Sequence, residues 1–222
     1  MEINKNDTAV LITDPQNDFL SEKGVTWELV GDSVKENKTV ENIERIFKAA
    51  KNNGFEIFIS PHYYYPTDYS WKFGGTVENI MHEIKMFDRS GALSLDGFSG
   101  SGADWLERYK SFIEDGKTIV VSPHKVYGPE NNDLILQLRK RNIGKIILGG
   151  MSANLCVEAH MRELLEQGFE VTVVKDATAG ARHPELGDGY KSALVNFGYI
   201  ANAVLSTDEV EKAMGNGMLA AA

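Results

Sequence analysis

Three residues that lie far apart in the sequence have the types needed for nucleophilic hydrolysis. Cys156, the only cysteine, lies in the turn GGMSANLCVEAH, Asp14 lies in VLITDPQNDF, and Lys125 lies in IVVSPHKVYG. A thiolate is a strong nucleophile, and a neighbouring cation lowers the pKa of a thiol. A carboxylate can take the thiol proton and return it to a leaving amine. The glycine-rich turn before Cys156 would also direct backbone N–H groups at a developing oxyanion.

Each of these residues also has a purely structural explanation. A lone cysteine in an α/β protein is usually a buried packing residue, and an aspartate before proline usually forms a turn. A lysine in a loop is usually a solvated charge. Only a shared position in the fold favours the chemical interpretation, so the elements that carry the three residues decide between the two.

The apolar pattern predicts a parallel sheet. Short apolar runs recur between amphipathic segments, and most are continuous, as in strands that are buried on both faces. The predicted strands are Thr8–Thr13, Phe55–Ser60, Thr118–Ser122, Lys145–Leu148, Val171–Val174 and Ile200–Leu205. Helical patterns alternate with them, among them Cys156–Gln167 and Tyr190–Phe197. We therefore predict a Rossmann-like α/β fold with three α/β/α layers and a mostly parallel six-stranded sheet.

The predicted sheet brings the three candidate residues together. Asp14 ends the first strand, Lys125 follows the third, and Cys156 opens the helix after the fourth. In open α/β sheets the ligand crevice lies beyond the carboxyl ends of the strands, so we expect all three at one edge.

One domain is expected over residues 1–222, with a helical and loop elaboration at about 61–116. Helical patterns cover Thr76–Phe87 and Ala103–Ile113 there, but no strand pattern is found. The aromatic stretch HYYYPTDYSWKF begins this elaboration. Its side chains could fill the core, form a subunit interface, line a pocket or form its lid.

Composition excludes several classes of function. The net charge is −9, with 23 Lys and Arg against 32 Asp and Glu, which argues against nucleic-acid binding. A single cysteine excludes an intramolecular disulfide. The beginning of the chain lacks the long apolar segment of a signal peptide, and no stretch is apolar enough to span a bilayer. We expect a soluble cytoplasmic protein that acts on a small molecule, with no membrane partner.

The segments LITDPQNDF, HK and GGMSANLCVEAH resemble the isochorismatase-like cysteine hydrolases, which include nicotinamidases, carbamoylsarcosine amidases and ureide-cleaving relatives. The resemblance covers nearly the whole chain in motif order and spacing. It implies a triad of Asp14 as general base and acid, Lys125 as electrostatic partner and Cys156 as nucleophile. It also implies a cis peptide at Met151–Ser152 and an oxyanion hole formed by the backbone amides of Ser152 and Cys156. Members of the family form dimers, tetramers or larger assemblies, so the resemblance implies a homo-oligomer.

The sequence departs from the family at the metal site of the nicotinamidases. Their Asp-x-His motif after the second strand is replaced by Ser60-Pro61-His62, and no second histidine follows nearby. One histidine is a poor metal site, so we expect neither a metal nor any other cofactor. The cysteine itself, which is lacking in the branches that act on the vinyl ether isochorismate, favours attack on a carbonyl carbon.

The leading hypothesis is a cysteine-dependent hydrolase that cleaves a C–N bond of a small amide, ureide or imide through a thioester. A second enzyme hypothesis pairs Cys156 with His160, one helical turn later. The non-enzymatic alternative is an oligomeric small-molecule-binding protein with an inert cysteine. The substrate-binding candidates are Phe19, Trp27 and Tyr127.

Overall fold

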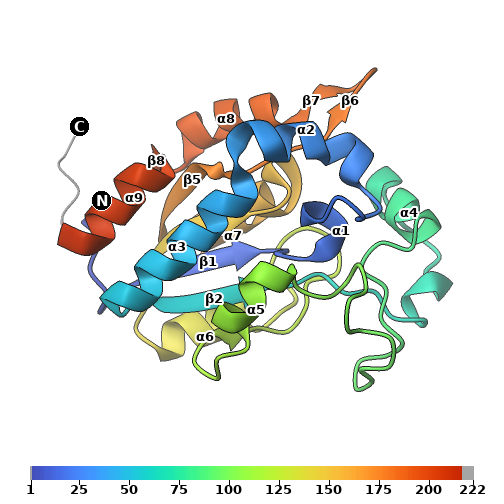
Figure 1. Ribbon diagram of the computed structural model, residues 1–222, viewed down its shortest axis with the longest axis horizontal. Helices are drawn as coiled ribbons and strands as arrows, with labels where there is room; N and C mark the ends of the chain where they lie inside the picture. The colour runs from blue at the N-terminus through green and yellow to red at the C-terminus, as the bar shows by residue number, and fades with distance from the viewer. Residues whose placement is uncertain (1, 217–222) are drawn as a thin grey trace.

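A computed structural model describes residues 2–216 of the chain. Over these residues a six-stranded parallel sheet has the order β3-β2-β1-β4-β5-β8. The strands of this sheet are β1 (Thr8–Thr13), β2 (Glu56–Ser60), β3 (Ile119–Val120), β4 (Lys145–Gly150), β5 (Glu170–Thr178) and β8 (Ala203–Leu205). The prediction of a three-layer α/β fold with this sheet is confirmed (Figure 1).

Helices cover both faces of the sheet (Figure 1). The longer helices are α2 (Trp27–Asn37), α3 (Thr39–Asn53), α4 (Thr76–Glu83), α6 (Leu134–Lys140), α7 (Glu158–Glu166), α8 (Gly189–Ile200) and α9 (Thr207–Asn216). The short ones are α1 (Asn17–Leu20), η1 (Asp68–Ser70), η2 (Glu107–Tyr109), α5 (Lys110–Ile113) and a π-helical turn, η3 (Ala153–Val157). No helix in the described range is both long and apolar enough to cross a bilayer.

Alternate side chains of each central strand pack into two separate hydrophobic cores, one on each face of the sheet. In β1, Val10 and Ile12 pack with α2, α3 and α9, whereas Ala9 and Leu11 pack with α6, α7 and α8. All six residues of β1 are buried, because successive side chains point to opposite faces and both faces are covered. This double burial explains the continuous apolar runs in the sequence.

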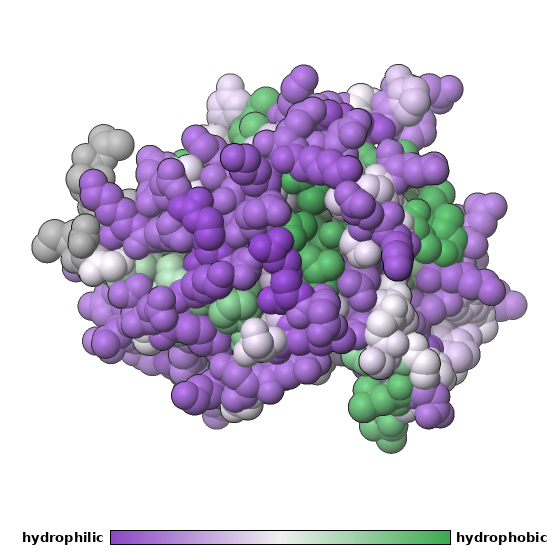
Figure 2. Space-filling model, viewed as in Figure 1, coloured by the Kyte–Doolittle hydropathy of each residue, from purple (hydrophilic) through white to green (hydrophobic). Residues whose placement is uncertain are grey.

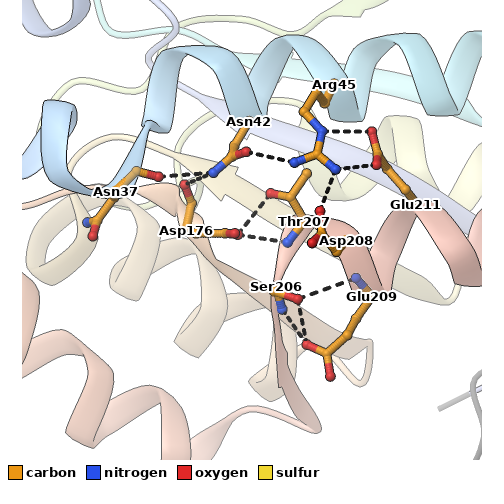
Figure 3. A network of polar contacts seen from close by, with 9 residues as sticks. All are labelled: Asn37, Asn42, Arg45, Asp176, Ser206, Thr207, Asp208, Glu209 and Glu211. Atoms are coloured by element: carbon orange, nitrogen blue, oxygen red, sulfur yellow. Dashed lines mark hydrogen bonds and ion pairs between the residues drawn. The ribbon is translucent and has the colours of Figure 1, made fainter.

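A polar network joins the helix layer to the sheet at α3, β5 and α9 (Figure 3). The Asp176 carboxylate accepts hydrogen bonds from the backbone and hydroxyl of Thr207. The Asn42 side chain donates to the Asp176 carbonyl, and Arg45 forms ion pairs with Asp208 and Glu211. These contacts fix where α9 begins. The face of the molecule seen in this view is mostly hydrophilic (Figure 2).

Several predicted boundaries differ from the structure. The helix predicted over Thr76–Phe87 ends at Glu83, because Lys85 and Phe87 both take a left-handed conformation. The helix predicted over Ala103–Ile113 is reduced to η2 and α5, since the Asp104 carboxylate holds a turn through the amides of Gly100 and Trp105. The small hairpin of β6 (Arg182–His183) and β7 (Gly187–Asp188) was not predicted.

The central strands β1 and β4 approach closely at their carboxyl ends. Gly150 has a φ of +112°, and a Cβ there would lie 2.1 Å from the Thr13 carbonyl oxygen. The Thr13 carbonyl accepts a hydrogen bond from the Met151 amide, and its hydroxyl donates to the Met151 carbonyl. Only glycine satisfies both the backbone conformation and the spacing. This contact joins the residue before Asp14 to the turn that leads to Cys156.

Gly150→Ala should therefore destabilise the fold by roughly 2–4 kcal/mol, from backbone strain and overpacking together. Gly144→Ala is the matched control, because a Cβ on Gly144 would meet no other atom within 4 Å. Urea unfolding followed by circular dichroism measures both. Equal stability of the two variants would contradict the close approach of β1 and β4.

Candidate active site

Four buried polar side chains meet at the carboxyl edge of the sheet. Asp14 follows β1, His62 follows β2, His124 follows β3, and Cys156 lies in η3 after β4. Each is at most 1% exposed, and one ligand-type atom from each lies within 4.8 Å of the other three. Asp14 and Cys156 are thus brought together as expected, whereas the two histidines were not assigned to this group from the sequence.

The Asp14 carboxylate is held in place from both its backbone and its side chain. Its φ is +47°, and its amide donates to the Ser60 carbonyl at 3.0 Å. Oδ1 lies 2.8 Å from His124 Nε2. A carboxylate only accepts hydrogen bonds, so with Asp14 ionised the Nε2–H of His124 is the donor. Oδ2 is buried and has no hydrogen-bond partner among residues 2–216.

Lys125 does not occupy the position that the sequence predicted for it. Its Nζ binds the Asp68 carboxylate at 2.5 Å and the Tyr63 carbonyl at 2.9 Å, and lies 3.6 Å from the centre of the Tyr65 ring. The residue in contact with Asp14 is His124 instead. The structure therefore brings Asp14 and Cys156 together and places the Lys125 ammonium on Asp68.

Backbone pairing explains why His124 rather than Lys125 contacts Asp14. His124 pairs with His62 as in a parallel sheet, and its amide donates to the Pro61 carbonyl. Successive side chains of an extended segment point to opposite sides, so His124 and Lys125 cannot both face Asp14. The sequence pointed to the dipeptide His-Lys. Which of its two side chains faces Asp14 depends on the pairing of residues 62 and 124, and the sequence pattern, interrupted by Pro123, does not reveal that pairing.

His62 is clamped by the side chain of Gln16. The Gln16 amide donates to the His62 carbonyl and accepts from the His62 amide, both at 2.9 Å. The His62 ring places Nε2 2.9 Å from the Lys125 carbonyl, which can only accept. Burial, with the neighbouring His124 adding to it, holds the pKa of His62 well below its usual value. The ring is therefore neutral, with its proton on Nε2 and a lone pair on Nδ1.

The Cys156 thiol is in its protonated form at rest. Burial is the largest cause that raises its pKa well above the ordinary value, followed by the negative charge of Asp14. The backbone amides of Ser152 and Cys156 act in the opposite direction. The sequence led us to expect a lowered pKa from a neighbouring cation, and burial acts in the reverse direction.

His160 is occupied by other partners. Its Nδ1 lies 2.7 Å from the Cys156 carbonyl, and its Nε2 lies 2.8 Å from the Ser60 hydroxyl. Burial lowers its pKa to about 3. Both ring nitrogens are engaged away from the thiol, which argues against the Cys156–His160 dyad.

A largely apolar cavity of about 260 Å³ lies beside the turn that carries Cys156. Its lining includes Phe19, Val30, Met81, Met86, Ser152 and Leu155. Of the substrate-binding candidates, Phe19 lines this cavity. Trp27, the first residue of α2, instead packs against the hydrophobic core, and the Lys35 ammonium lies 5.4 Å from the centre of its ring. Tyr127 is half-buried, and burial followed by the negative charge of Glu78 raises its phenol pKa.

The aromatic stretch after β2 serves several purposes. Tyr63 and Tyr64 are buried in the core that α2 and α3 share, and Tyr65 lies under the Lys125 ammonium. Tyr69 stacks on His82 at the surface.

The Met151–Ser152 peptide, in the turn that leads to Cys156, is cis.

The electrostatics of the site can be tested on the thiol, because Cys156 is the only cysteine. In EDTA-containing buffer, alkylation by iodoacetamide should be slow at neutral pH and accelerate only at alkaline pH. Asp14→Asn removes the negative charge that disfavours the thiolate, so the rate profile should move to lower pH by roughly one unit. Lys125→Met, whose ammonium pairs with Asp68, should leave the profile in place. A profile that moves with Lys125→Met would return the lysine to the site.

Comparison with known proteins gives consistent matches. A family model described as "Isochorismatase domain" matches residues 8–209. Ureidoacrylate amidohydrolase RutB of Methylorubrum extorquens is 26% identical over 215 residues, covering 92% of this chain and 85% of the relative. The uncharacterised isochorismatase family protein YddQ of Bacillus subtilis is 23% identical over 172 residues, covering 78% of this chain and 77% of the relative.

Solved structures share the fold. A cysteine hydrolase from Pseudomonas syringae superposes with a TM-score of 0.79 at 20% identity, covering 98% of this chain and 96% of that chain. N-carbamoylsarcosine amidase from Thermoplasma acidophilum gives a TM-score of 0.67 at 18% identity, with 91% and 98% covered.

Proposed function

This chain belongs to the isochorismatase family of hydrolases, and on that premise we propose that it cleaves a C–N bond of a small amide, ureide or imide. The reaction proceeds through a thioester on Cys156. The observation that carries the proposal is the buried thiol beside the Asp14 carboxylate. The lowering effect of the Ser152 and Cys156 amides on the thiol pKa supports it.

The first half of the reaction transfers the acyl group to the enzyme. Cys156 Sγ attacks the carbonyl carbon while its proton passes to the Asp14 carboxylate, whose Oδ2 is free to accept it. The carbonyl oxygen becomes an oxyanion that the amides of Ser152 and Cys156 stabilise. The C–N bond then breaks, and Asp14 returns the proton to the leaving nitrogen.

The second half restores the enzyme. A water molecule attacks the thioester carbon and gives a proton to Asp14, the C–S bond breaks, and the thiolate recovers the proton. A resting thiol suits this sequence, because the nucleophile is deprotonated only when a carbonyl is present to accept attack. The raised pKa keeps the thiol protonated until the general base, Asp14, removes its proton during attack.

His124 acts as a positioning residue. Its Nε2–H fixes Asp14 Oδ1 at 2.8 Å, so that Oδ2 is the oxygen available to the thiol. The family resemblance implies a lysine in this role, whereas this chain supplies an imidazole.

The cavity supports a substrate class. Its lining is dominated by apolar side chains such as Phe19, Met81 and Leu155. A buried apolar wall favours an amide or ureide with an apolar substituent over one with a second charge. RutB is named for ureidoacrylate, so ureides belong in the first panel of compounds to be tested.

Hydrolysis of a panel of small amides, ureides and imides tests the proposal. Cys156→Ala should abolish turnover, and Asp14→Asn should lower kcat by about a hundredfold or more, because the amide keeps the shape but accepts no proton. Asp32→Asn, an exposed carboxylate on α2, is the control. Rapid quenching and mass spectrometry should find the acyl group on Cys156. Full turnover by Cys156→Ala would refute the thioester mechanism.

We also infer a cytoplasmic homo-oligomer, as predicted from the sequence. Val195 and Tyr199 on α8 are 59% and 88% exposed, which supports a subunit interface on that helix. Size-exclusion chromatography with light scattering should give a dimer or tetramer, and a monomer at micromolar concentration would contradict the inference.

A further inference from the structure

Three polar atoms around the thiol are buried and make no hydrogen bond to any residue between 2 and 216. They are Asp14 Oδ2, His62 Nδ1 and His124 Nδ1. A buried polar atom without a partner costs about 1–3 kcal/mol, and native proteins contain few of them. The proposed hydrolysis uses Asp14 Oδ2, but it assigns nothing to the two imidazole nitrogens. Because these residues surround the Cys156 thiol, the unpartnered atoms call for a ligand that the hydrolysis does not supply.

His124 Nε2 lies 2.8 Å from Asp14 Oδ1, a spacing at which both atoms can bind one cation once the ring proton has moved to the unpartnered Nδ1. The His62 ring is fixed in the manner of a metal-binding histidine, because it directs Nε2–H to the Lys125 carbonyl. Such a hydrogen bond to a carbonyl or carboxylate sets the tautomer and leaves the other nitrogen free to ligate. The Gln16 clamp on the His62 backbone adds rigidity to the arrangement.

The donor set also specifies the class of cation. One thiolate, two imidazoles and one carboxylate are ligands for Zn²⁺, whereas Mg²⁺ and Ca²⁺ require mostly oxygen. One ligand-type atom from each of Asp14, His62, His124 and Cys156 lies within 4.8 Å of the other three. Tetrahedral zinc with ordinary bond lengths needs ligands about 3.3–3.8 Å apart, so closure by about 1 Å completes the site.

We propose that Asp14, His62, His124 and Cys156 form a zinc site that switches the hydrolase off. Binding exchanges the thiol proton for the metal: a Cys156 S–Zn bond forms and one proton is released to solvent. The thiolate and the carboxylate then balance the charge of Zn²⁺ within a buried site. The inhibitory role rests on the proposed function, because zinc would occupy both the nucleophile and the general base.

The site differs from the metal arrangement sought in the sequence. That search asked for ligands close to His62 in the chain, as in the nicotinamidases. Here the partners of His62 come from three other strand ends, so sequence spacing gives no indication of them.

Cobalt and zinc titrations of the chelator-treated protein test the site without any substrate. Co²⁺ should bind once per chain and give the intense visible bands of tetrahedral cobalt, with a thiolate-to-cobalt charge-transfer band in the near ultraviolet. Zn²⁺ should displace it with a Kd of about 1 µM or tighter and should block alkylation of Cys156. A weak octahedral spectrum without the charge-transfer band, or alkylation unaffected by zinc, would overturn the proposal.

His62→Asn removes a ligand that takes no part in the proposed hydrolysis and should weaken zinc binding at least tenfold. His82→Asn is the matched control, because its ring packs among Tyr64, Tyr69 and Trp71 and should leave zinc affinity unchanged. If His62→Asn fails to fold, the cobalt spectrum of the wild-type protein still shows whether the metal site exists. Equal zinc affinity in His62→Asn and the wild type would refute this ligand set.

The two proposals fail in different ways. Activity in chelator that zinc does not inhibit would refute the switch and leave the thioester mechanism standing. Hydrolysis by Cys156→Ala would refute the thioester mechanism, while the cobalt spectrum of the wild-type protein would still judge the metal site. Hydrolysis that requires zinc would overturn the inhibitory role.

Discussion

The close approach of β1 and β4 at Thr13 and Gly150 is the contact on which the rest of the site depends. The Thr13 carbonyl accepts from the Met151 amide and the Thr13 hydroxyl donates to the Met151 carbonyl, which holds the turn after β4. A side chain on Gly150 would separate the two strands. Asp14 immediately follows one of these residues, and Cys156 lies a few residues beyond the other. Their proximity follows from strand pairing rather than from any direct attraction between acid and thiol.

Burial then determines the chemistry of the grouped side chains. Removal from water disfavours every charge, so the Cys156 thiol keeps its proton and the His62 and His160 rings stay neutral. A buried contact of 2.8 Å between His124 Nε2 and Asp14 Oδ1 orients the carboxylate. The Lys125 ammonium is paired with Asp68 outside the group.

The same features that suit a buried acid and nucleophile also suit a metal. Hydrogen bonds orient the Asp14 carboxylate and the two imidazoles, and each of these groups keeps an unpartnered buried atom beside the thiol. A hydrolase site and a zinc site therefore require the same scaffold here. What separates them is whether the thiol proton leaves for Asp14 with a substrate or for solvent with a cation.

The sequence by itself determined the sheet, because strands buried on both faces leave continuous apolar runs such as Thr8–Thr13. It also placed Asp14 and Cys156 at neighbouring strand ends, since parallel strands present their carboxyl ends at one edge. Only the tertiary structure decided between His124 and Lys125, because that choice depends on the pairing of residues 62 and 124. The raised thiol pKa and the part taken by His62 likewise depend on burial and on contacts between separate strands, which local sequence patterns do not encode.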